Sequence, residues 1–190
     1  MPFRDAGRGR SDFNTSIHDC LWGFWKAQRN GLINMNDFHV AEYEYYEKVE
    51  NGDWNWLTPG FIAFASPSDP VWIRQQKQQA GSQASPIVPS FSRKLPQPYQ
   101  NCLDYFEERN VKLVVRLNNP LYDKATFEER GMEHMELYFD DGTNPTDEIV
   151  REFIARSEAV HEAGGAVAVH VRQLPPKCPK AVLMTFRVLV

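Results

Sequence analysis

The residues most able to exchange protons in this sequence follow predicted strands. Asp141 stands in a polar loop just after an apolar run that ends at Phe139, and His170 closes a second apolar run. In open α/β sheets, reactive groups gather beyond the carboxyl ends of the parallel strands. We therefore expect the most informative residues of this chain after Leu117, Phe139 and Val169.

Taken alone, both side chains also have a purely structural interpretation. Asp141 can be a loop or helix-capping acid ahead of Pro145. A histidine at a strand end is often a hydrogen-bonded structural residue. Residue type and position leave these alternatives open.

The first part of the chain predicts two helices. Apolar residues recur at helical spacing over 15–29, where Asn14 can cap the start and Asn30-Gly31 can end the helix. Asp37 can cap a second, glutamate-rich helix that runs to about residue 50 and is closed by Asn51-Gly52. Two strand-like runs, 54–57 and 61–65, then flank a Thr-Pro-Gly turn and predict a hairpin.

The segment 66–98 is rich in Gln, Ser and Pro and has no acidic residue after Asp69. Such a composition is too polar to bury a core, so we expect a mobile, weakly basic loop.

From residue 99 onward helices and strands alternate. We expect helices at 99–109, 124–130 and 145–163, and strands at 112–117, 135–139 and 166–170. The last strand is continuously apolar, as in a strand buried on both faces. The alternation predicts an α/β fold with a central, mostly parallel sheet flanked by helices.

Composition excludes several classes of function. The 190 residues carry a net charge of −4 with scattered basic residues, so nucleic acid is not an expected partner. No segment reaches the roughly 20 apolar residues that cross a bilayer, and the start lacks a signal-peptide core, so we expect neither membrane insertion nor secretion. Cys20, Cys102 and Cys178 are odd in number and far apart, which argues against a disulfide framework and a zinc site and fits a reducing compartment.

Five collinear blocks carry a family resemblance: PFRDA, EYEYYEKVENGDWNW, VVRLNNPLYD, FDDGTNPTD and GGAVAVH. They resemble successive blocks of the cell-division-cycle phosphatases of the "fourteen" type, which are dual-specificity enzymes of mitotic exit. The resemblance implies a phosphatase-like domain, incomplete at both ends. It assigns 1–52 to inter-domain connector helices, 53–170 to the amino-terminal part of the catalytic domain, and 171–190 to a divergent tail.

The resemblance also implies a mechanism without metal or cofactor. In this family a cysteine in an H-C-x5-R loop attacks phosphorus, backbone N–H groups and the arginine hold the phosphoryl oxygens, and an aspartic acid protonates the leaving group. Asp141 matches this general acid, although Asp140 beside it departs from the usual apolar residue. His170 matches the histidine that precedes the nucleophile, but Val171 stands where the cysteine belongs.

A replacement for the missing nucleophile is not evident in the sequence. Six residues after the three cysteines stand Lys26, Glu108 and Met184, so none satisfies the C-x5-R spacing. The residues after His170 contain no glycine and include Pro175, Pro176 and Pro179, which lack the N–H groups of a phosphate-binding loop. We therefore predict that this chain is catalytically inactive. Our hypothesis is that the tail arises from a retained intron or a shifted reading frame.

The acidic helix is a candidate substrate groove. The resemblance implies a negative groove for phosphoserine-proline substrates followed by basic residues, with these candidates: Glu42, Glu44, Glu47, Glu50 and Asp53. A solvated helix face explains the same pattern. Phosphoproteins are thus the expected partners, and the resemblance implies a location in the nucleus, nucleolus and cytoplasm. Two other possibilities are a pseudophosphatase or interaction module that binds through the acidic helix, and a chain without a stable fold.

Overall fold

The structure is a computed structural model that describes residues 14–31, 33–80, 89, 92–140 and 145–170. It divides the chain into two compact units, Met1–Ala41 and Glu42–Val190. The predicted assignment of 1–52, 53–170 and 171–190 to connector, catalytic part and tail stays a prediction.

In the first unit, α1 (Ile17–Arg29) forms where helical spacing predicts it, but its cap differs from the prediction. Ser16, not Asn14, is the N-cap: its Oγ accepts from the Asp19 N–H, and the Asp19 carboxylate accepts from the Ser16 N–H at 2.8 Å. This reciprocal capping box satisfies two N–H groups at the helix start.

The predicted helix over residues 37–50 is wrong as a single element. It is divided into η1 (Met35–Asp37), α2 (Val40–Tyr46) and η2 (Val49–Asn51). Phe38 and Lys48 take extended backbone conformations, which no helix can continue through. Gly52, with φ at 119°, ends the region in a left-handed conformation.

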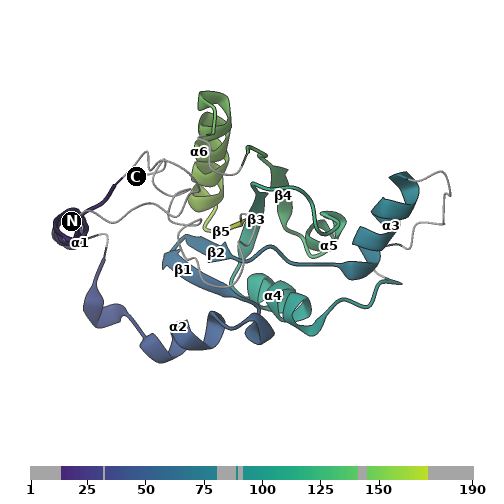
Figure 1. The fold of residues 1–190 in the computed structure, drawn as a ribbon, viewed down its shortest axis with the longest axis horizontal. Helices are drawn as coiled ribbons and strands as arrows, with labels where there is room; N and C mark the ends of the chain where they lie inside the picture. Colours follow the sequence, from purple (N-terminus) through teal and green to yellow (C-terminus); the bar gives the residue numbers. More distant parts are fainter. Residues whose placement is uncertain (1–13, 32, 81–88, 90–91, 141–144, 171–190) are drawn as a thin grey trace. The chain divides into compact units, whose positions relative to one another are not determined.

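The second unit contains a five-stranded sheet in the order β1-β2-β5-β3-β4 (Figure 1). Its strands are β1 (Trp54–Thr58), β2 (Phe61–Phe64), β3 (Val111–Arg116), β4 (Glu133–Glu136) and β5 (Ala166–His170). β1 and β2 form the predicted antiparallel hairpin, whereas β2, β5, β3 and β4 run parallel. The predicted α/β fold with a mostly parallel sheet is confirmed.

The predicted elements after residue 96 are all present, with shifted ends. The helices are α4 (Gln97–Glu108), α5 (Ala125–Glu128) and α6 (Asp147–Glu162). β5 covers the predicted residues and is buried throughout. β4 begins two residues before the predicted strand because it pairs with β3 from Glu133, a register that local pattern does not reveal.

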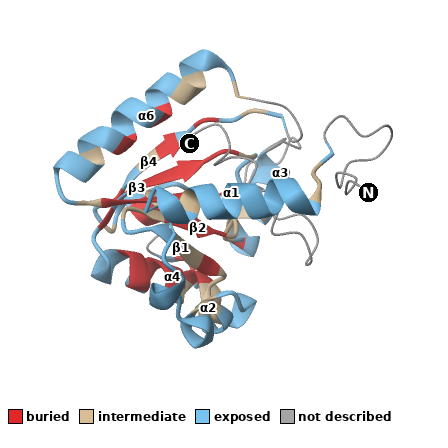
Figure 2. Cartoon of the chain, turned by 90° about the vertical axis from the view of Figure 1, so that its left-hand side faces the viewer, coloured by how far each residue is buried: buried red, intermediate tan, exposed pale blue. Residues whose placement is uncertain are grey.

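Helices cover both faces of this sheet, and each face has its own core (Figures 1 and 2). Residues of α4 and α5, including Phe106 and Phe127, pack with Val114 of β3 and Ala168 of β5. On the other face, Phe153 of α6 packs with a cluster from β3, β4 and β5. Alternate residues of each central strand therefore face opposite helix layers.

The interpretation of 66–98 as a polar loop that buries nothing is wrong. The segment contains helix α3 (Pro70–Ala80) and the start of α4. Asp69, Gln75 and Arg93 are buried. Ion pairing explains the burial of Asp69 and Arg93, because a charged side chain can be buried when it meets an opposite charge.

Candidate functional site

Charged and polar side chains meet at the carboxyl edge of the parallel strands. Arg116 at the end of β3 is the register partner of His170 on β5 and of Glu136 on β4. His170 and Arg116 are buried, with 1% and 3% of their surfaces exposed. This is the edge at which open α/β sheets bind ligands.

The Tyr122 hydroxyl joins two histidines at this edge. It lies 2.7 Å from Nε2 of His170 and 2.8 Å from Nε2 of His134, at the second position of β4. The ring of Phe64 packs edge-on against His170, with centroids 4.7 Å apart. The side chains of Tyr122, His170, His134 and Phe64 lie on the face of the sheet that α4 and α5 cover. There the His170 ring contacts the rings of Phe64 and Tyr122.

Burial keeps both imidazoles neutral. The pKa of His170 is lowered well below its ordinary value, first by loss of hydration and then by the nearby Arg116 cation. Burial and then Arg116 lower the pKa of His134 to about 3. Burial also raises the pKa of the Tyr122 phenol, which therefore stays protonated.

One hydroxyl proton shared between two neutral imidazoles has a consequence for their tautomers. The hydroxyl of Tyr122 donates to one Nε2, and the other Nε2 must carry its own hydrogen and donate to the phenol oxygen. His134 and His170 therefore carry their protons on different ring nitrogens.

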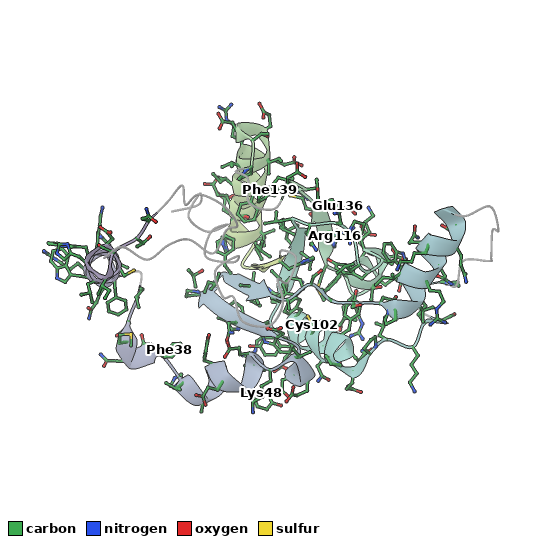
Figure 3. The ribbon with its side chains drawn as sticks, viewed as in Figure 1. Phe38, Lys48, Cys102, Arg116, Glu136 and Phe139 are labelled. Carbon is green, nitrogen blue, oxygen red and sulfur yellow. The ribbon has the colours of Figure 1, made fainter. Side chains whose placement is uncertain are left out.

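Arg116 holds the surrounding loop in place. Its guanidinium lies 2.5 Å from Oε1 of Glu136 and donates from Nη1 to the Tyr122 carbonyl oxygen at 3.1 Å. Figure 3 labels Arg116 and Glu136, which come from the neighbouring strands β3 and β4. It also lies over the Tyr122 ring, 4.8 Å from the centroid. With its charge paired in this way, Arg116 orients Tyr122 toward the two histidines.

Of the residues predicted at the reactive centre, the structure places one. His170 lies at the carboxyl edge, as predicted from its position after an apolar strand. Asp141 and Val171 lie outside the described residues, and the predicted roles of Asp141 and His170 in catalysis stay predictions. Cys102 is buried in α4, as a small apolar residue would be, and burial raises its thiol pKa well above the ordinary value.

The candidate groove residues do not share one helix. Glu42 and Glu44 lie in α2, Glu47 follows that helix, and Glu50 lies in η2. All four are exposed. Asp53 is half-buried in the left-handed conformation, with φ at 59°. The segment is anchored by Tyr46, whose ring packs 5.0 Å from Trp54 and 5.1 Å from Tyr105.

Sequence reasoning missed Tyr122, His134 and Arg116. Tyr122 and His134 are brought to His170 from 48 residues and 36 residues away. Tyr122 and Arg116 lie in the block VVRLNNPLYD that carries the family resemblance, but nothing in the block singles out either residue. Arg116 carries a weak signal, since a charged residue follows the apolar run Leu113, Val114 and Val115 at the end of β3. Within the described part of the chain, no three His, Cys, Asp or Glu side chains form a potential metal site. The described helices also include none with the length and apolar character to cross a membrane.

Comparison with known proteins finds several that are similar to this chain in sequence. No protein-family model matches the chain. Among solved structures, a protein tyrosine phosphatase (putative) from Leishmania major aligns with a TM-score of 0.42 and 17% identity, over 68% of this chain and 69% of that chain. The active form of Tk-PTP aligns with a TM-score of 0.41 and 17% identity, over 63% and 61%.

The curated relatives are more similar. The chain is 48% identical to "Tyrosine-protein phosphatase CDC14 homolog" of Schizosaccharomyces pombe and 44% identical to "Tyrosine-protein phosphatase CDC14" of Saccharomyces cerevisiae, each over 90% of this chain and 29% of the relative. It is 39% identical to the human "Dual specificity protein phosphatase CDC14A", over 90% of this chain and 26% of that protein. The chain thus spans less than a third of the length of these relatives. Over that stretch, the sequence of this chain is similar to those of the CDC14 dual-specificity phosphatases.

Proposed function

We propose that residues 53–170 form part of the scaffold of a dual-specificity protein phosphatase domain whose complete reaction uses a cysteinyl-phosphate intermediate. The homology to CDC14 phosphatases supports the class of enzyme. The carboxyl edge supports it physically, because His170 is buried and held by Tyr122 where a reactive group following β5 would begin. Phosphorylated proteins are the proposed substrates.

We further propose that the 190-residue chain does not hydrolyse phosphate esters. The single observation that carries this proposal is the valine at position 171, directly after His170. A valine side chain has no lone pair with which to attack phosphorus. Among the described cysteines, Cys102 is buried within the core and Cys20 lies on α1 in the other unit.

A direct test measures hydrolysis of an aryl phosphate and of a phosphoserine-proline peptide by the purified chain, with and without vanadate. The expected rate equals that of buffer. Vanadate-sensitive turnover, or a phosphorylated cysteine trapped and identified by mass spectrometry, would refute the proposed inactivity without refuting the class of domain.

A second candidate function is binding without turnover. The exposed glutamates at 42, 44, 47 and 50 favour it, because they give this segment a negative surface that suits basic residues of a peptide. Tyr46 keeps the segment on the domain. Binding of a labelled phosphoserine-proline-lysine peptide that weakens when these four residues are changed to Gln would support it. Equal binding by both proteins would exclude it.

The same family resemblance leads us to propose a location in the nucleus, nucleolus and cytoplasm. Imaging of the tagged chain in cells tests this, and exclusive location in another compartment would contradict it.

A further inference from the structure

The polar segment between α3 and α4 supplies a buried cation to the fold. The guanidinium of Arg93 has no exposed side-chain surface, although the residues around it in sequence are mostly polar. Burying an unpaired guanidinium is strongly unfavourable, so its position depends on the charges that it meets.

Arg93 meets two carboxylates from different parts of the chain. Its Nε lies 3.1 Å from Oδ2 of Asp69, and its Nη2 lies 2.9 Å from Oδ2 of Asp123. Asp69 stands just before α3, and Asp123 stands in the connection between β3 and α5. One guanidinium therefore ties together two segments that are 54 residues apart.

The other oxygen of each carboxylate is also engaged. Oδ1 of Asp69 accepts from two N–H groups in the first turn of α3, those of Val71 and Trp72, both at 3.0 Å. Oδ1 of Asp123 accepts from the Ala125 N–H at 3.1 Å, at the start of α5. Backbone N–H groups thus orient both carboxylates independently of their ion pairs with Arg93.

Tyr122 is the residue that precedes Asp123. On its other side, the carbonyl oxygen of Leu121 accepts from the Asp69 N–H at 3.0 Å. The carbonyl of Tyr122 itself accepts from Arg116. Three consecutive residues, 121 to 123, are therefore held by separate polar contacts, and the one in the middle carries the hydroxyl that binds His170.

We infer that Arg93 is a positioning residue: through its ion pair with Asp123, with Asp69 as its second anchor, it holds the Tyr122 hydroxyl in hydrogen-bonding distance of His170. The inference rests on the proposed function in one respect: orienting His170 matters for catalysis only if a reactive group follows it at position 171. The contacts themselves are independent of any activity. The segment 66–98 is thus part of the support of the carboxyl edge.

The experiment observes the imidazole nitrogens of His170 in the full chain labelled with ¹⁵N-histidine, by long-range ¹H–¹⁵N correlation. The Tyr122→Phe variant calibrates the shift produced when the hydroxyl is absent. We expect Arg93→Ala to move the His170 Nε2 signal at least half as far in the same direction. Arg151→Ala is the control, since Arg151 makes an exposed ion pair with Asp147 on α6, on the opposite face of the sheet from Tyr122, and it should leave the His170 signal in place.

A second variant separates positioning from folding. Asp123→Asn keeps an oxygen for the Ala125 N–H but presents an amide group to Arg93, so the domain should fold while the ion pair is lost. It should shift the His170 signal as Arg93→Ala does. An unchanged His170 signal in either folded variant would overturn the inference, and so would loss of cooperative folding in both, because the role of Arg93 would then be global. Phosphatase assays do not enter this readout, so its failure is distinct from failure of the proposed function.

Discussion

Arg116 and His170 are register partners on adjacent parallel strands, and both side chains are buried on the same face of the sheet. A permanent cation beside a buried imidazole opposes protonation of the imidazole, and loss of hydration opposes it further. The cation is itself neutralised by Glu136. Burial and the Arg116 cation together keep His170 neutral as the pH falls.

The first prediction concerns pH. His134 and His170 have folded pKa values below the ordinary value of 6.5. Between the folded and unfolded pKa values the unfolded chain binds more protons, so the free energy of unfolding rises with pH and its histidine contribution is complete above about pH 6.5. For His134 the contribution is lost progressively from there down to about pH 3.

Urea denaturation at pH 7.5, 6.5 and 5.5 tests this. The free energy of unfolding should fall toward pH 5.5, by up to about 1.4 kcal/mol per pH unit for each histidine. A His134→Gln variant should show a shallower dependence. A flat profile of the wild-type protein between pH 7.5 and 5.5 would contradict the neutral state of the buried His170 and the half-buried His134.

The second prediction is that Tyr122→Phe destabilises the domain by about 1–3 kcal/mol, because a buried imidazole nitrogen of His170 and a half-buried one of His134 lose their shared partner. Tyr138→Phe is a matched control. Its hydroxyl donates to Asp140 at 2.7 Å on the exposed surface, and its loss should change stability by less than about 0.5 kcal/mol. An equal loss in the free energy of unfolding for both variants, measured by urea denaturation, would contradict a stabilising role for the buried Tyr122 hydroxyl.

The third prediction is that Val171→Cys does not create a phosphatase. A thiol alone lacks the ring of N–H donors that stabilises the phosphoryl oxygens, and the sequence after position 171 contains Pro175, Pro176 and Pro179 and no glycine. Aryl phosphate hydrolysis by this variant should stay at the buffer rate. A burst of phenol release equal to the enzyme concentration would show that the tail does support phosphoryl transfer.

The fourth prediction concerns Gly52. Its φ is 119°, and a Cβ added there would lie 1.5 Å from the ring of Trp54, which is buried in the core. Gly52→Ala should therefore destabilise the domain by roughly 1–3 kcal/mol through strain and displacement of that ring.

The comparison for this variant is Gly165→Ala. There the new Cβ would lie 2.6 Å from Cγ of Lys112, a flexible side chain that can move away, so the loss should be smaller. Thermal or urea unfolding of the two variants decides the order. A larger loss for Gly165→Ala would contradict the argument from Trp54.

The amino-acid sequence alone determined the order of most elements, the mixed α/β class, the buried strand that ends at His170, and the valine that follows it. Those features depend on hydrophobic periodicity and turn residues, which act between neighbours along the chain. Over 37–50 the capping Asp37 and the closing Asn51-Gly52 were misleading, because Phe38 and Lys48 take extended conformations between them.

Only the tertiary structure decided that Arg93 and Asp69 are buried together and that Tyr122 joins His134 to His170. The sequence around a polar residue does not reveal which charged group or hydroxyl, many residues away, will be its partner. Its burial becomes favourable only when the sheet and its connections bring that partner within hydrogen-bonding distance.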